Sequence, residues 1–170
     1  MENKQINITG KRNTDKILNL KEPKRNDFTL DEVFLDFNKQ LEVLRLLYFN
    51  DKFDDMEQIL KVLEKKRKGY KYQDVSKNKY DEDQFITLET MIELLLTSKL
   101  RCKYCCQHVL LFYDKVGERK QWTLDRIDNT CGHNNDNVVI SCLNCNIKRQ
   151  DLDYDRFKKS KEIRRIVKQE

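Results

Sequence analysis

The sequence predicts an α+β fold in which a helical N-terminal region is followed by a small β-containing module held together by cysteines. Apolar residues recur at helical spacing up to about residue 99, and beyond it short β-like runs alternate with turn residues. Two Cys-x-x-Cys pairs, at 102–105 and 142–145, frame those runs. The predicted division is a flexible basic arm over 1–28, a helical region over 29–99 and the cysteine-containing domain over 100–170, which ends in a basic helix.

The composition limits the size of the core and the class of protein. The chain has 170 residues, of which 38% are hydrophobic and 37% charged, and its formal net charge is +5. This excess favours acidic partners such as nucleic acid, although a heavily charged, solvated surface has the same composition. The N-terminus lacks the apolar segment of a secretory signal, and no stretch approaches the ~20 apolar residues of a membrane-spanning helix. We therefore expect an intracellular protein, not secreted and without a membrane partner, in which cysteines bind metal more readily than they form disulfides.

Three amphipathic helices are predicted in the helical region. The first begins near Thr29, which with Glu32 has the spacing of a capping box. The second spans residues 55–68 and stops at Gly69, and the third spans about 87–99. We interpret the apolar stripes of the first two as the core of a helical hairpin.

A stretch of basic and aromatic residues, 65–72, overlaps the C-terminal end of the second predicted helix. Cations interleaved with aromatic rings suit phosphate contact and base stacking, so Lys66, Arg67 and Tyr70 are candidate nucleic-acid contacts. A frayed, solvated helix end would have the same residues. The polar stretch 73–84 that follows is predicted to be a loop.

The second half of the chain is predicted to contain three β-like runs and two helices. Gly117 is placed in a hairpin turn between the first two runs. The helices are expected over about 143–151 and 154–168, and the second is basic enough to clamp a duplex or to be a charged surface helix. The β-like runs cover residues 109–113, 122–127 and 138–141.

The paired cysteines predict a structural zinc site. Each pair can place two thiolates on one metal in a tight turn, and four thiolates complete a tetrahedral shell that leaves no open position. Reduced core cysteines or a redox pair are the alternatives. Cys106 and Cys131 are interpreted as ordinary small residues, because the matched spacing favours Cys105 over Cys106. The predicted ligands of Zn²⁺ are Cys102, Cys105, Cys142 and Cys145.

The residues between and after the cysteine pairs resemble the HNH endonuclease family. The segment 122–129 reads Trp-Thr-Leu-Asp-Arg-Ile-Asp-Asn, 132–140 reads Gly-His-Asn-Asn-Asp-Asn-Val-Val-Ile, and 145–149 reads Cys-Asn-Ile-Lys-Arg. In that family a strand ends in Asp-His, a loop leads to an Asn before a second strand, and a helix carries Cys-x-x-Cys followed by His or Asn. The resemblance extends from about Leu100 to Gln150.

This resemblance implies a ββα-metal fold and an endonuclease that hydrolyses phosphodiester bonds in DNA with one Mg²⁺ or Mn²⁺ ion, and it makes double-stranded DNA the expected partner. Asp125 at a strand end and Asn146 at a helix start would be that ion's oxygen ligands. Asn137 matches the family's middle Asn, which orients the general base or pins the loop; a simple turn residue is the alternative. Lys148 and Arg149 on the last helix of the motif would contact phosphate, or be solvated.

One position departs from the family pattern. Arg126 stands where the motif has its first His, and Arg remains charged at all relevant pH values, so it cannot be an ordinary general base. It could instead hold the scissile phosphate or stabilise its charge. His133, Asp128 or a metal-bound hydroxide could then be the base, with a loop-packing residue as the alternative role of His133.

Two other functions fit the same residues. One is a zinc-stabilised nucleic-acid-binding protein without cleavage, in which Arg126 marks a decayed site. The other is a structural or assembly factor that uses the zinc module as a scaffold. The Asp-Arg-Ile-Asp variant of the motif is similar to that of phage and large DNA virus proteins, which implies the cytoplasm or nucleus of a host cell. The sequence indicates no protein partner.

Overall fold

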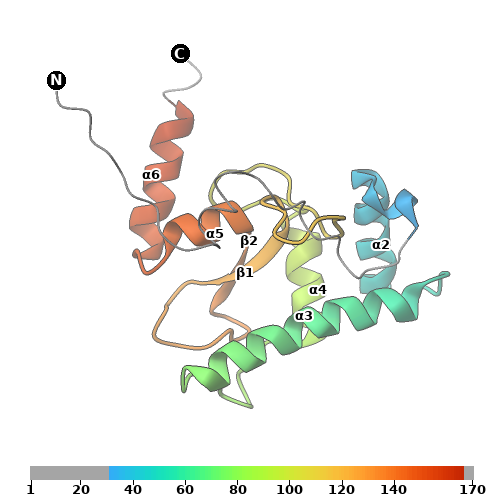
Figure 1. The fold of residues 1–170 in the computed structure, drawn as a ribbon, viewed down its shortest axis with the longest axis horizontal. Helices are drawn as coiled ribbons and strands as arrows, with labels where there is room; N and C mark the ends of the chain where they lie inside the picture. The colour runs from blue at the N-terminus through green and yellow to red at the C-terminus, as the bar shows by residue number, and fades with distance from the viewer. Residues whose placement is uncertain (1–30, 167–170) are drawn as a thin grey trace, which may run out of the picture.

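A computed structural model describes residues 31–166 as a mixed α+β fold, which confirms the predicted class (Figure 1). The predicted arm 1–28 and the predicted helix start at Thr29 lie outside the described residues. In chain order the elements are η1 (Glu32–Leu35, a 3-10 helix), α2 (Phe37–Phe49), α3 (Met56–Ser76), α4 (Leu88–Thr97), β1 (Trp122–Arg126), β2 (Val138–Cys142), α5 (Leu143–Arg149) and α6 (Tyr154–Ile166).

Short polar side chains set the starts of α2 and α4. The Asp36 carboxylate accepts a hydrogen bond from the Lys39 N–H at 2.9 Å, and the Thr87 hydroxyl accepts one from the Thr90 N–H at 3.1 Å. Each satisfies one backbone donor that the helix itself leaves without a partner. The third predicted helix, 87–99, is therefore confirmed with Thr87 as its N-cap.

Helix α3 is longer than predicted. It continues through Gly69 to Ser76, so the predicted stop was wrong and the first residues of the predicted loop 73–84 are helical. A mid-helix glycine costs about 1 kcal/mol relative to alanine. The C-terminal half of α3 offsets that cost because Tyr70 and Asp74 are buried against the rest of the chain.

Strands β1 and β2 pair antiparallel, with Trp122 opposite Cys142 and Arg126 opposite Val138. Two of the three predicted β-like runs are thus confirmed. The third, 109–113, forms no strand and makes only one parallel bridge, from Leu110 to Gln121.

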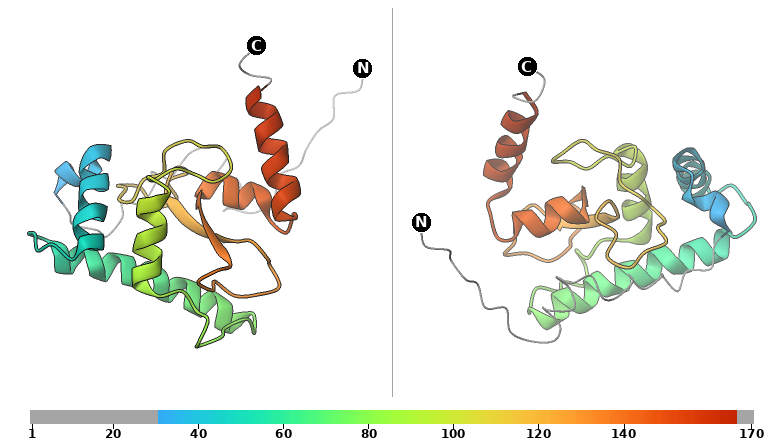
Figure 2. Two further views of the ribbon diagram at one scale, coloured as in Figure 1. Left: turned by 180° about the vertical axis from the view of Figure 1, so that it is seen from behind. Right: turned by 45° about the horizontal axis from the view of Figure 1, so that its top comes forward.

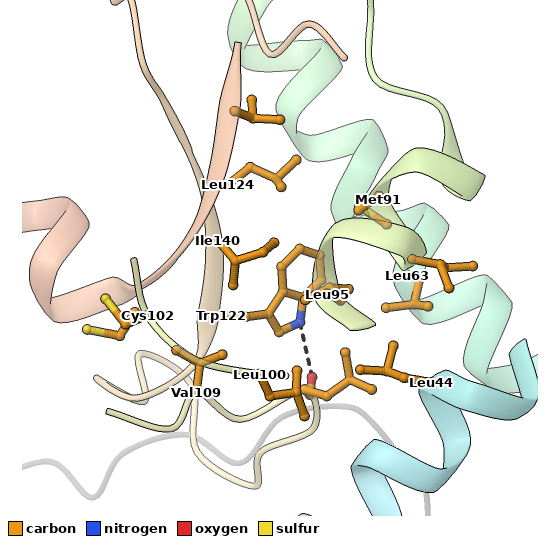
Figure 3. Packing of buried hydrophobic residues seen from close by; sticks show 14 of the residues in the cluster. Leu44, Leu63, Met91, Leu95, Leu100, Cys102, Val109, Trp122, Leu124 and Ile140 are labelled. Atoms are coloured by element: carbon orange, nitrogen blue, oxygen red, sulfur yellow. Dashed lines mark hydrogen bonds between the residues drawn. The ribbon is translucent and has the colours of Figure 1, made fainter. Parts of the chain in front are cut away.

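Side chains form hydrogen bonds with backbone groups of residues 109–113, and these groups are then no longer free to pair with a second strand. The Leu111 N–H donates to the Gln40 side-chain carbonyl at 2.8 Å, and the Gln40 amide donates to the Phe112 carbonyl at 3.3 Å. The Trp122 indole N–H donates to the Leu111 carbonyl at 3.2 Å, the dashed line in Figure 3. Gly117 lies in a turn at φ +80°, a left-handed conformation that favours glycine, but that turn does not join two strands.

The two halves of the chain share one hydrophobic core. Trp122 and Leu124 from β1 and Ile140 from β2 face Leu95 of α4 and Leu63 of α3 (Figure 3). The other face of the sheet is turned toward α5 and α6, so that the sheet lies between α4 and α6 in both views of Figure 2. Among residues 31–166, no helix combines the length and apolar character needed to cross a membrane.

Replacing Tyr70 with Phe tests how α3 is joined to the sheet. The Tyr70 hydroxyl accepts a hydrogen bond from the Leu124 N–H at 2.9 Å. Tyr70→Phe leaves that buried donor unsatisfied, so the free energy of unfolding in urea should fall by about 1–2 kcal/mol. Tyr72→Phe is the matched control, because the Tyr72 side chain is 76% exposed on the same helix. Equal stabilities for the two variants would contradict this role of the Tyr70 hydroxyl.

Candidate functional site

The four predicted zinc ligands form one cluster. The Sγ atoms of Cys102, Cys105, Cys142 and Cys145 all lie within 4.8 Å of one another. Cys105 Sγ and Cys142 Sγ are 3.9 Å apart. A tetrahedral zinc with Zn–S bonds of about 2.3 Å places its sulfurs about 3.8 Å apart. The cluster could therefore hold a metal, and both its geometry and its soft sulfur donors suit zinc.

Backbone hydrogen bonds shape the first cysteine turn, residues 102–107. The Cys106 N–H donates to the Cys102 carbonyl and the Cys102 N–H to the Gln107 carbonyl, both at 2.9 Å. Cys106 adopts a left-handed conformation at φ +57°, which turns the chain back after the second ligand. The Lys103 N–H donates to the Ile140 carbonyl at 2.9 Å, so this turn is also tied to β2.

The second cysteine pair is placed by α5. The Cys142 sulfur caps this helix by accepting a hydrogen bond from the Cys145 N–H at 3.4 Å. Contact with the Cys102 sulfur lowers the pKa of Cys105 and raises the pKa of Cys145. These opposite shifts are expected when neighbouring thiols compete for protons, and a bound metal would replace those protons.

Asp125, the predicted metal ligand on β1, is buried and both of its oxygens have protein partners. The Tyr104 hydroxyl donates to Oδ2 at 2.6 Å and Arg149 Nη1 donates to Oδ1 at 2.8 Å. Burial raises the pKa of Asp125, and the two donors oppose that effect. Burial and the neighbouring carboxylate together raise the pKa of Tyr104. In this arrangement the carboxylate forms an ion pair with Arg149.

Arg149 is directed inward and is not a surface phosphate contact. Its side chain is 1% exposed, and besides Asp125 it donates to the carbonyls of Arg126 and Ile127, the latter at 3.0 Å. It thereby fastens the last residue of α5 to the end of β1. Lys148, its neighbour, is exposed. Of the two cations predicted to contact phosphate from this helix, the structure leaves only Lys148 at the surface.

Asn146 lies against the same strand end as Asp125. Its amide donates to the Thr123 hydroxyl at 3.1 Å and to the Leu124 carbonyl at 3.2 Å. The Leu124 carbonyl belongs to the peptide that leads into Asp125. The structure therefore places the Asn146 amide nitrogen of α5 against the backbone of β1 that leads into Asp125.

Asn137 pins the loop between the strands. Its side-chain oxygen accepts the Asp128 N–H at 2.8 Å, and its amide donates to the carbonyls of Asp128 and Gly132, both at 2.9 Å. The loop also requires glycine at position 132, because a Cβ there would collide with the Lys79 carbonyl. These contacts hold the loop in one conformation next to the end of β1.

Arg126 lies on the other face of the sheet from Asp125, because successive side chains of a strand point to opposite faces, and Arg126 and His133 both approach Asp74 of α3. His133 Nδ1 is 2.8 Å from Asp74 Oδ1 on α3, and the His133 N–H donates to Asp74 Oδ2 at 2.7 Å. Arg126 Nη1 lies 4.0 Å from Asp74 Oδ1. Burial lowers the pKa of His133, with Asp74 opposing. The structure thus places His133 in a buried contact with Asp74 of α3, and its role as a general base stays a prediction.

The candidate contacts in the stretch 65–72 are turned into the protein. Lys66 donates to the Trp122 carbonyl and lies 4.1 Å from the indole centroid, and its burial lowers its pKa to about 7. Arg67 pairs with Glu64 at 2.7 Å, and Tyr70 is 7% exposed. Lys66 and Tyr70 therefore serve the junction of α3 with the sheet, which corrects their interpretation as nucleic-acid contacts. Arg67 instead pairs within α3 and donates to the Ile86 carbonyl at 3.0 Å.

Two residues of the site were not anticipated. Asp74 is four residues after Tyr70, a spacing that puts both residues on one face of a helix. The predicted helix ended before them at Gly69, so this signal was not used. Tyr104 lies between two predicted zinc ligands, where an aromatic residue is ordinarily a packing residue. No sequence pattern marks its hydroxyl as the partner of Asp125.

Comparisons of this chain with family models, with curated proteins and with solved structures find no match. The function is therefore inferred from the geometry of the chain's own residues.

Replacing one cysteine of the cluster should abolish metal binding. The wild type is expected to hold one zinc per chain by elemental analysis, because the sulfurs converge on a single position. Cys145→Ser should lose that zinc and the cooperative thermal transition, since a two-stranded sheet is marginal without it. Cys131→Ser is the matched control, because Cys131 is exposed and outside the cluster. Full zinc content in Cys145→Ser would contradict the four-sulfur site.

Proposed function

We propose that this chain is a zinc-stapled nuclease of the HNH type that hydrolyses phosphodiester bonds in DNA. The observation that supports the proposal best is the β1–β2–α5 unit, in which Asp125 on the first strand and Asn146 on the helix lie at one strand end. The four-cysteine cluster fastens the same unit at the junction of β2 and α5. A carboxylate and an amide oxygen are the donors that a hard divalent cation prefers.

Asp125 and Asn146 would hold a Mg²⁺ or Mn²⁺ ion, which would relieve negative charge on the phosphate. The donor set fits this chemistry, because each carboxylate oxygen has two lone pairs and the protein uses one on each. Arg149 already neutralises the Asp125 carboxylate, so the guanidinium and the metal ion would have to bind this carboxylate together. Lys148, exposed on α5, is available to bind a phosphate of the substrate.

The surrounding residues give this site its rigidity. Arg149 and Tyr104 orient the Asp125 carboxylate from opposite sides, and Asn137 fixes the loop that follows β1. Residues held in place by several contacts do not need to reorganise when a substrate binds. Arg126, one residue after Asp125, donates to the Cys131 carbonyl at 3.2 Å and keeps a positive charge near the strand end.

A second function, nucleic-acid binding without cleavage, is favoured by the ion pair between Asp125 and Arg149. A guanidinium 2.8 Å from the carboxylate supplies the compensating charge that a metal ion would otherwise supply. In that case the ββα unit would be a zinc-stabilised binding module and the buried pair a structural contact.

A plasmid-nicking assay distinguishes the two functions. With Mg²⁺ or Mn²⁺ the wild type should convert supercoiled plasmid to the nicked form. Asp125→Asn, which keeps the size of the side chain, should lower that rate by about a hundredfold or more through loss of the charged ligand. Asn146→Ala should also lower it, and this variant leaves the buried ion pair in place.

The control for this assay is Asp136→Asn, an exposed acid in the loop before β2. It should nick at the wild-type rate, and every variant should contain the same amount of zinc. Wild-type protein that binds the plasmid but leaves it supercoiled with either ion would exclude the nuclease and support the binding module.

A further inference from the structure

A groove lies next to the four-cysteine cluster, along the sheet edge that β2 forms. It has a volume of about 460 Å³ and lies between the end of α4, the first cysteine turn and α6. Its floor is formed by β2, at Val138, Val139 and Ile140. We call it the knuckle groove. None of the residues proposed for the nuclease site lines it.

The charged side chains that line the knuckle groove are mainly cations. Arg101 and Lys103 come from the cysteine turn and Lys158 from α6, and Glu162 is the one acid among the described lining residues. Within residues 31–166, neither Lys103 nor Lys158 forms an ion pair. Their positive charge is therefore available to a ligand. An anion in this groove would meet cations from two different walls.

The walls of the groove are held in fixed relative positions. The Lys103 N–H donates to the Ile140 carbonyl at 2.9 Å, which joins the cysteine turn to the floor. Tyr104, next along the turn, packs edge-on against Phe157 of α6 at a centroid distance of 4.9 Å. Lys103 and Lys158 adjoin these two aromatic residues in sequence, so the contact fixes the backbone from which both ammonium groups extend.

The geometry points to the sugar–phosphate backbone of DNA as the occupant of the knuckle groove. This inference rests on the proposed function, in which DNA is the substrate. A nucleic-acid strand carries one negative charge at every phosphate, so it can meet Arg101, Lys103 and Lys158 without a particular base sequence. Helix α6 also carries the exposed cations Arg156 and Lys159.

Binding of a fluorescent DNA duplex, measured by anisotropy without added divalent ion, tests this inference. The double variant Lys103→Ala/Lys158→Ala should bind about tenfold more weakly than the wild type at moderate salt. The slope of log affinity against log salt should become shallower by about two, because two phosphate contacts are lost. Its zinc content and thermal transition should match the wild type.

The matched control is Lys52→Ala/Lys65→Ala, which removes the same charge from two exposed lysines near the start and middle of α3. Equal weakening of DNA binding in both double variants would overturn the proposal that the groove binds DNA, because the effect would then follow net charge alone. Poly-glutamate that competes with the duplex at equal charge concentration would also overturn it, in favour of an acidic protein partner.

The outcomes separate this inference from the nuclease. If the groove variant binds DNA weakly and the wild type never nicks plasmid, the role of the groove is supported and the nuclease proposal is excluded. If the groove variant binds DNA as tightly as the wild type while Asp125→Asn abolishes nicking, the role of the groove is excluded and the nuclease proposal is retained.

Discussion

The convergence of four cysteine sulfurs organises the second half of the chain. It joins the turn after α4 to the junction of β2 and α5, two segments far apart in the chain. One face of the two-stranded sheet packs on α3 and α4, but the cysteine turn and α5 add little apolar surface of their own. Zinc at this point would stabilise that turn and helix. It also sets the position of Tyr104, which lies between two ligands and reaches Asp125 with its hydroxyl.

The buried pair of Asp125 and Arg149 follows from this constraint. Removing two charges from water is costly unless both are paired and hydrogen-bonded. Here the carboxylate receives two donors, and the guanidinium reaches three carbonyl or carboxylate oxygens. The pair orients α5 against β1 and gives the candidate site a fixed geometry. A nuclease would use that fixed geometry for catalysis, whereas a binding module would need it only for folding.

The four-cysteine cluster, β1, β2 and α4 could be predicted from the sequence because each depends on local spacing. Cys-x-x-Cys pairs, alternating apolar residues and a capping threonine act within a few residues of one another. The length of α3 could not be predicted in this way. Gly69 signals a stop locally, but the burial of Tyr70 and Asp74 against distant segments extends the helix. The run 109–113 fails as a strand for the same reason, since Gln40 and Trp122 take its backbone groups.

The site was predictable in position but only partly in its contacts. The order of motifs predicts that Asp125 and Asn146 lie at the same strand end, and the Asn146 amide donates to the Leu124 carbonyl, which precedes Asp125. Their hydrogen-bond partners depend on tertiary packing: Arg149 turns inward, and His133 is held by α3 on the other face of the sheet.

The zinc site requires both cysteine pairs to bind one metal ion. Zinc K-edge X-ray absorption on the purified protein measures the ligand atoms directly. Four sulfur neighbours at about 2.3 Å are expected, with no nitrogen or oxygen in the same shell. A shell of two sulfurs with lighter atoms would mean that the pairs occupy separate sites, and it would contradict the arrangement from which the function is argued.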